Sequence, residues 1–328
     1  MLLMGRSMRR REFLGVLGSA AAAWPLAARA QQSAKLPSIG ILDPAALPRR
    51  IAATRQRLQE LGWVDGRTVT IEYRQATEQR FDEILAEFVR RKVDVIFTFG
   101  TPPVIAAKKA TSSIPIVFVS VGDPIGSGLV TSLARPGGNI TGVANQTKDI
   151  AGKRVGLLRE MLPNLRKLAV MTRMDNPSSV AELREVQAAA GTLDIQAFPL
   201  EIRRAEDIGS AFESLKERPD ALYVVIDALL TFHAIRINTL ALGSRLPTML
   251  GGRELVEAGG LMSYGADYQD LWRRGADYID KILRGTKPAD IPVEQPTKFD
   301  FIINQTTAKA LAIDMPLSLL GRANEVIE

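Results

Sequence analysis

Polar side chains follow several apolar, strand-like runs of this chain, at the point where each run ends. The segments concerned are 98–103, 121–124, 175–179 and Asp227. In open α/β sheets, ligands bind in the crevice at the carboxyl ends of the strands, so these residues could hydrogen-bond a small polar molecule there. Their Asp, Asn, Ser and Thr side chains are also standard helix N-caps, which is the competing structural role. Because they recur at matching positions in both halves of the chain, they predict the two walls of one cleft.

Residues for acid–base, nucleophilic or metal chemistry are scarce. The chain has a single histidine, His233, and no cysteine, so zinc or iron sites of the usual ligand sets cannot be assembled. No Gly-x-Ser-x-Gly turn supplies a serine nucleophile, and the glycine-rich run 122–128 lacks the dinucleotide-binding spacing. Carboxylate pairs stay open as a catalytic alternative, although no pair stands out by its spacing. The composition therefore favours a binding protein without metal, cofactor or catalytic residues.

The first thirty residues have the pattern of an export signal. A twin-arginine run at 9–11 is followed by an apolar stretch at 16–26, and Ala28 and Ala30 suit a signal peptidase. The apolar stretch is far shorter than the roughly 20 residues that span a membrane. An amphipathic first helix fits less well, because the Ala/Gly-rich stretch has no polar face. We therefore expect a twin-arginine-type signal peptide at 1–30, cleavage after Ala30 and a periplasmic protein.

Removal of this segment would change the charge of the chain. The formal net charge falls from +6 to +2, because 37 of the 42 basic and 35 of the 36 acidic residues remain. No basic stripe interleaved with aromatic residues is left, so we expect no nucleic-acid partner. A chain of about 300 residues buries enough apolar surface to fold without disulfides.

Strand-like and helix-like segments alternate along the rest of the sequence. Strands are predicted at 38–42, 69–73, 93–99, 114–121, 167–172, 194–200, 220–226, 246–250 and 299–303. Helices are predicted at 51–61, 80–91, 103–110, 178–190, 205–217, 229–243 and 269–284. This order predicts an α/β fold with parallel sheets and right-handed crossovers. The length suits two lobes, and the turn-rich stretch 135–139 separates two sets of strand–helix units.

Five motifs are similar to those of one protein family. They are Phe-Gly-Thr-Pro at 99–102, Ile-Pro-Ile-Val-Phe at 114–118, Gly-Asp-Pro at 122–124, Arg-Pro-Gly-Gly-Asn-Ile-Thr-Gly at 135–142 and Gly-Gly-Leu-Met-Ser-Tyr-Gly at 259–265. The chain resembles the exported substrate-binding proteins of ABC transporters, whose best-known branch binds tryptophan and related aromatic amino acids. The resemblance implies a type I-like periplasmic-binding-protein fold, with two Rossmann-like lobes joined by a hinge. Lobe 1 is expected at 36–145 plus 262–288, and lobe 2 at 146–261 plus 289–328.

The same resemblance implies which residues bind the ligand. They are Thr101 and Pro102 on the wall of lobe 1, Asn145 at the first crossing, Asn176 and Ser178 at the start of lobe 2, and Asp227 and Tyr264 on the second wall and the hinge side. Asp123 joins them from the strand-end pattern. A core or hinge role is the alternative for Tyr264.

Two departures from the aromatic-binding branch concern the ligand. That branch tends to carry Ser-Asp where this chain has Asn145 and Gln146, and Asp-Asn where it has Asp227 and Ala228. An acidic group at the first place would pair with a ligand ammonium, so its absence argues against an aromatic amino acid. The implied fold and transport role are unaffected.

These observations predict a monomeric periplasmic receptor without enzymatic activity. It would capture a small polar or amino-acid-like solute by hinge closure and deliver it to the permease of an ABC importer. An exported α/β enzyme that uses cleft carboxylates is the alternative, since fold alone does not decide function.

Overall fold

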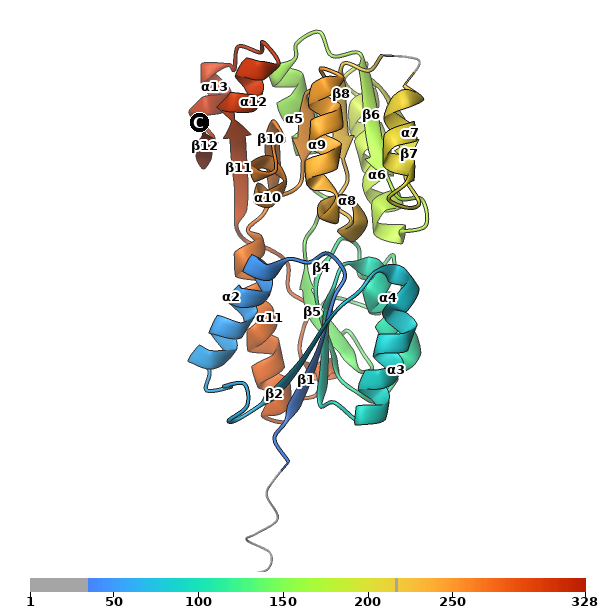
Figure 1. Ribbon diagram of the computed structural model, residues 1–328, viewed down its shortest axis with the longest axis vertical. Coiled ribbons are helices and arrows are strands. Elements are labelled where there is room, and N and C mark those ends of the chain that lie inside the picture. The colour runs from blue at the N-terminus through green and yellow to red at the C-terminus, as the bar shows by residue number, and fades with distance from the viewer. Residues whose placement is uncertain (1–34, 216–217) are drawn as a thin grey trace, which may run out of the picture. The chain divides into compact units, whose positions relative to one another are not determined.

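The computed structural model describes residues 35–215 and 218–328. The expected signal peptide at 1–30 lies outside the described residues. Residues 37–328 form one compact unit that contains two β-sheets, one of five strands and one of seven (Figure 1). We call the two sheets with their helices lobe 1 and lobe 2.

Lobe 1 is built on a parallel sheet with the strand order β2-β1-β3-β4-β5. Its strands are β1 (Ser38–Asp43), β2 (Thr70–Gln75), β3 (Val95–Phe99), β4 (Ile116–Val121) and β5 (Ile140–Ala144). Its helices are α2 (Pro48–Glu60), the 3-10 helix η1 (Glu78–Arg80), α3 (Phe81–Arg91), α4 (Thr101–Ala110), α11 (Tyr268–Leu283) and the 3-10 helix η2 (Pro288–Asp290). Helices α2 and α11 share one hydrophobic core with the sheet, and α3 and α4 share another, so both faces are covered (Figure 1).

The sequence of this lobe explains its elements. Strands β3 and β4 are buried along their whole length, as parallel strands covered on both faces require. In α3 the apolar residues Phe81, Ile84, Leu85 and Phe88 fall on one buried stripe, while acidic residues occupy its first turn and basic residues its last. These elements hold the carboxyl ends of β3 and β4 in fixed positions beside each other.

Lobe 2 is built on a sheet with the order β12-β11-β10-β9-β8-β6-β7. Its strands are β6 (Lys167–Thr172), β7 (Gln196–Glu201), β8 (Ala221–Val224), β9 (Thr248–Leu250), β10 (Met262–Ala266), β11 (Phe299–Asn304) and β12 (Glu325–Ile327). Its helices are α5 (Ala151–Met161), α6 (Pro177–Gly191), α7 (Asp207–Glu213), α8 (Ala228–Phe232), α9 (Ala234–Gly243), α10 (Arg253–Glu257), α12 (Gln305–Ala310) and α13 (Leu317–Leu320). Strands β10 and β11 are antiparallel, and the other neighbours in the sheet are parallel.

The chain passes between the lobes after β5, between β10 and α11, and before β11. The expected lobe boundaries differ from this arrangement at two places. Strand β10 at 262–266 was expected in lobe 1 but pairs with β9 and β11 of lobe 2. Residues 291–294 were expected in lobe 2 but stay on lobe 1, where Ile291 joins the core and Glu294 bridges Val143. Both segments lie at crossings, where local sequence does not reveal which sheet a strand joins.

Other differences are local. The stretch 135–139 does not end lobe 1, because β5 follows it and still pairs with β4. The helix expected at 229–243 is interrupted at His233, which separates α8 from α9. The prediction of an α/β chain with two lobes of mainly parallel strands is confirmed. Within the described ranges, no helix is both long and apolar enough to cross a membrane.

Candidate functional site

A small cavity lies between the carboxyl ends of the strands of the two lobes. Its volume is about 30 Å³, which is room for one or two water molecules. Six of the eight predicted site residues line it: Thr101, Pro102, Asn145, Asn176, Ser178 and Asp227. The strand-end pattern therefore identified residues that the fold brings together from both halves of the chain.

Hydroxyl groups join the two lobes at this cavity. Thr101 at the start of α4 and Ser178 at the start of α6 share a hydrogen bond of 2.7 Å between their Oγ atoms. The Ser178 hydroxyl also accepts from the backbone N–H of Asp123 at 3.2 Å. Gly100, with a φ of 77°, makes the turn from β3 that places Thr101 here. The walls thus touch through short polar side chains that any solute between them would meet.

Asn176 and Asp227 have the capping role that the sequence left open, and they also line the cavity. Asn176 Oδ1 accepts from the N–H of Ser178, and Asp227 Oδ1 accepts from the N–H of Leu229. The two side chains also bind each other, since Asn176 Nδ2 donates to Asp227 Oδ2 at 2.8 Å. Burial raises the pKa of Asp227, against the opposing effect of Arg173 and of the hydrogen bonds. The Asp227 carboxylate is therefore held by the protein itself.

Asn145 lies at the first crossing, as the resemblance implied. Its Nδ2 donates to Ser120 Oγ at 3.0 Å. Ser120 is a buried residue at the end of β4 with a φ of 59°, in the left-handed region that non-glycine residues seldom adopt. Gln146 has a φ of 55°. Unusual backbone conformations of this kind cluster at binding sites; Ser120 is the hydrogen-bond partner of Asn145, and Gln146 follows it in sequence.

Asp123 and Tyr264 do not line the cavity. Asp123 Oδ1 accepts from the N–H of Gly126, and its Oδ2 accepts from Lys148 Nζ at 2.9 Å. The hydrogen bond to Asp123 raises the pKa of Lys148. The Tyr264 ring stacks on Phe299 of the neighbouring strand, with ring centres 5.9 Å apart. Both residues lie near the crossings, so the hinge alternative for Tyr264 fits its position better than ligand contact does.

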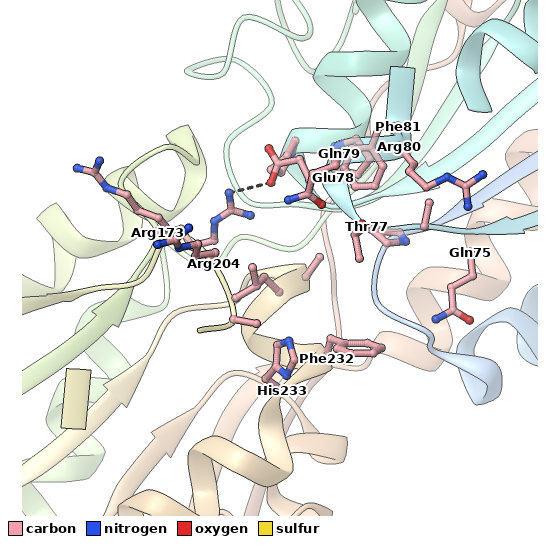
Figure 2. Close-up of a pocket in the computed structure, with 18 of the residues that line it drawn as sticks. Gln75, Thr77, Glu78, Gln79, Arg80, Phe81, Arg173, Arg204, Phe232 and His233 are labelled. Carbon is pink, nitrogen blue, oxygen red and sulfur yellow. Dashed lines mark hydrogen bonds and ion pairs between the residues drawn. The ribbon is translucent and has the colours of Figure 1, made fainter. Parts of the chain in front are cut away.

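A larger pocket of about 430 Å³ adjoins the cavity and shares Pro102 and Ala228 with it (Figure 2). Lobe 1 contributes residues 75–81 and Pro103, and lobe 2 contributes 203–206, 228–229 and 232–233 together with Arg173. The volume is in the range of small-molecule sites. The sequence did not predict this pocket, because most of its lining comes from the loops after β2 and β7, which carry no run of N-cap residues.

Arg173 is the most buried charged residue of the larger pocket, with 5% of its side chain exposed. Its Nη2 donates to Glu78 Oε2 of lobe 1 at 2.8 Å, and its Nε donates to Asp175 Oδ1 at 3.0 Å. Asp227 Oδ1 lies 3.9 Å from its Nη1. Burial lowers the pKa of Arg173, but these three carboxylates outweigh it and raise the pKa above its ordinary value. The guanidinium is therefore a permanent positive charge in the cleft.

A second ion pair joins the lobes beside the small cavity. Arg50 of α2 donates to both carboxylate oxygens of Glu254 of α10, at 2.8 and 2.7 Å. Its guanidinium also lies over the ring of Tyr268, 4.0 Å from the centre. Arg50 and Arg173 were not among the site residues predicted from the sequence. Arg173 directly follows β6, so the strand-end rule would have found it had the rule included basic residues as well as acidic ones.

The arrangement can bind a small molecule, and no metal centre is evident in it. Among the residues that the structure describes, no group of three or more His, Cys, Asp or Glu side chains could hold a metal ion. His233 lines the larger pocket, where burial above all lowers its pKa. Arg236 lowers the pKa of His233 further, and Glu206 acts in the opposite direction.

The chain is similar to known proteins over most of its length. The family model of ABC transporter substrate binding proteins matches residues 39–327. A tyrosine-binding protein from Clostridioides difficile is 28% identical over 256 residues, which cover 77% of this chain and 74% of that protein.

Solved structures extend the comparison. A crystal structure of an ABC domain in complex with L-Trp from Streptococcus pneumonia is 26% identical, with a TM-score of 0.84, and the match covers 89% of this chain and all of that one. The glucose-galactose binding protein GanP from Geobacillus stearothermophilus is 14% identical with a TM-score of 0.61, over 82% of this chain and 98% of that one. The latter likeness shows the fold alone.

Proposed function

Because the chain belongs to the family of ABC transporter substrate-binding proteins, which are not enzymes, we propose that it is a periplasmic receptor for an amino-acid-like solute. A twin-arginine-type signal at 1–30 would export it. The solute would be captured between the two lobes and delivered to a membrane permease. Closure of the lobes around the solute is the step that the permease would recognise.

One observation carries this proposal. Residues from strand ends of both lobes line one cavity, and side chains of the two lobes touch across it through Thr101 and Ser178. A solute that binds both walls favours the closed arrangement, because only that arrangement offers all its contacts at once. The relatives named for tyrosine and L-Trp support an amino-acid-like solute. The amide pair at 145–146 argues that the solute differs from theirs in its charged groups.

The proposal is tested by identifying what the protein carries. Mass spectrometry of small molecules released by denaturing the purified protein should reveal one dominant solute. Returned to the refolded protein, that solute should raise the melting temperature and reduce the radius of gyration in small-angle scattering. At about 100 times its dissociation constant it adds roughly 2.7 kcal/mol of stability. A tight solute that stabilises the protein without compaction would contradict closure, and the absence of any bound or binding solute would contradict the receptor role.

A further inference from the structure

An arginine of one lobe binds a carboxylate of the other inside the larger pocket. The loop after β6 supplies Arg173, and η1 of lobe 1 supplies Glu78 (Figure 2). The two side chains differ in burial, since 5% of Arg173 is exposed and 46% of Glu78. The guanidinium is therefore fixed in the wall, while the carboxylate that meets it reaches in from the edge.

We propose that Arg173 binds a carboxylate group of the solute, and that Glu78 competes with the solute for that place. This inference rests on the proposed receptor function. Asp175 binds both Nε, at 3.0 Å, and Nη2, at 2.5 Å, and Asp227 lies beside Nη1, so the side chain is oriented before any solute arrives. The second hydrogen bond of Nη2 goes to Glu78, and a solute carboxylate could accept it instead as a charge-assisted hydrogen bond.

Arginines outnumber acidic residues in the lining of the pocket. Its lining includes four arginines, Arg80, Arg173, Arg203 and Arg204, against two glutamates, Glu78 and Glu206. A solute carboxylate in place of Glu78 keeps the number of carboxylates around Arg173 unchanged. The three exposed arginines also have acidic neighbours outside the lining, so the preference for an anion rests on the place that Glu78 would leave at Arg173.

The remaining walls indicate the body of the solute. Pro44, Pro102, Pro103, Phe81 and Phe232 contribute apolar surface to the pocket. Phe232 is 51% exposed, so its ring is available to cover a ligand. The chemical class is therefore a small carboxylate with a ring or a compact apolar body, in which the carboxylate rather than an ammonium group provides the main charged contact.

Competition by Glu78 has a measurable consequence. The Glu78–Arg173 contact must break before a solute carboxylate can take its place, so it weakens binding by the free energy it contributes. Glu78→Ala should therefore tighten the binding of carboxylates by about tenfold, as expected for a charge-assisted hydrogen bond that is partly exposed. Arg173→Gln should weaken the same binding by about tenfold or more.

The experiment uses the full processed chain, unfolded and refolded to remove bound molecules, and three probes of one shape. These are L-tyrosine, 3-(4-hydroxyphenyl)propanoate, which lacks the ammonium, and tyramine, which lacks the carboxylate. Calorimetry should show binding of the two carboxylates and none of tyramine. Arg322→Gln is the matched control, because Arg322 belongs to lobe 2 but does not line the pocket, and with 47% of its side chain exposed it should change affinity less than about twofold.

Three results would overturn the assignment: failure of both carboxylates to bind at millimolar concentration, binding of tyramine as tight as that of the carboxylates, or unchanged carboxylate affinity in Glu78→Ala. Because Glu78 is an exposed residue of a short 3-10 helix, that variant tests the idea even if Arg173→Gln does not fold. If the protein releases and rebinds a solute without a carboxylate, this inference fails while the receptor function stands.

Discussion

The ion pair between Arg50 and Glu254 offers a direct test of how the lobes are held together. Arg50 is 6% exposed and Glu254 23% exposed in their side chains, and the two form a bidentate pair between α2 and α10. Replacement of Glu254 by Gln removes the charge and keeps the shape. It leaves the Arg50 guanidinium enclosed by Tyr268 and Trp272 without its anionic partner.

The size of the effect follows from burial. Breaking a fully buried pair costs about 3–5 kcal/mol, whereas an exposed pair contributes about 0–1 kcal/mol. Glu254 keeps some contact with water, and Gln can still accept one hydrogen bond. We therefore expect Glu254→Gln to lower the free energy of unfolding by about 2 kcal/mol. For a compact unit that spans residues 37–328, this corresponds to a melting temperature lower by about 3 °C.

The effect should depend on pH in one direction. Burial raises the pKa of Glu254, but the charge and hydrogen bonds of Arg50 outweigh it, so the pKa lies below its ordinary value of 4.5. Such a group stabilises the folded state above its unfolded pKa, and this stabilisation is lost as pH falls through the folded pKa. The difference between wild type and Glu254→Gln should be constant near neutral pH and should shrink below about pH 4.5.

Urea denaturation of both proteins across this pH range provides the measurement. Glu257→Gln is the matched control, since Glu257 lies one turn away on α10 and pairs with Arg49, whose side chain is 72% exposed. That variant should lose less than about 1 kcal/mol. Equal losses in the two variants, or a loss in Glu254→Gln that persists unchanged in acid, would refute the reasoning.

Three further predictions concern the cavity, a close backbone contact and export. Thr101→Val should weaken solute binding by about tenfold with little change in melting temperature. Asp227→Ala should also lower stability by about 0.5–2 kcal/mol, because it removes an N-cap. Calorimetry measures the loss of affinity, and thermal melts measure the loss of stability. Gly265→Ala should lower stability by more than about 2 kcal/mol in urea denaturation, since its Cβ would lie 2.0 Å from a backbone oxygen of the loop after β9. Gly156→Ala in α5 is the control: its Cβ would have no neighbour within 4 Å, so this variant should be neutral or stabilising. Replacement of the arginine pair Arg10–Arg11 by lysines should leave unprocessed precursor in the cytoplasm, and normal processing at Ala30 in a fractionation experiment would contradict the twin-arginine assignment.

Much of the fold could be predicted because buried parallel strands have a strong signal in sequence. Continuous apolar runs predicted β1, β3, β4 and β6 to within two residues of their bounds. The assignment of β10 failed for a different reason: a strand at a crossing is equally apolar whichever sheet it joins. Its membership of lobe 2 depends on pairing with β9 and β11, which is a long-range property.

The candidate site likewise contains residues that local sequence predicted and residues whose contacts depend on long-range packing. Thr101, Asn176 and Asp227 were found because parallel strands bring their carboxyl ends to one edge, so local position implies spatial proximity. Glu78 and Arg173 were not found, because their meeting depends on the two lobes facing each other across the cleft. Neither residue has a neighbour in sequence that indicates the contact.

The sequence and the structure both indicate which charged group of the solute the site binds. The sequence lacks an acidic residue at 145–146, where a ligand ammonium would be met. In the structure, Asp227 is the one carboxylate among the described residues that line the small cavity, and the N–H of Leu229 and the amide of Asn176 already occupy it. Arg173, in contrast, holds a fixed positive charge at the edge of the larger pocket. The site therefore offers a fixed cation to a solute carboxylate, but its small cavity offers no free carboxylate to a solute ammonium. Removal of a probe's ammonium should consequently cost less affinity than removal of its carboxylate.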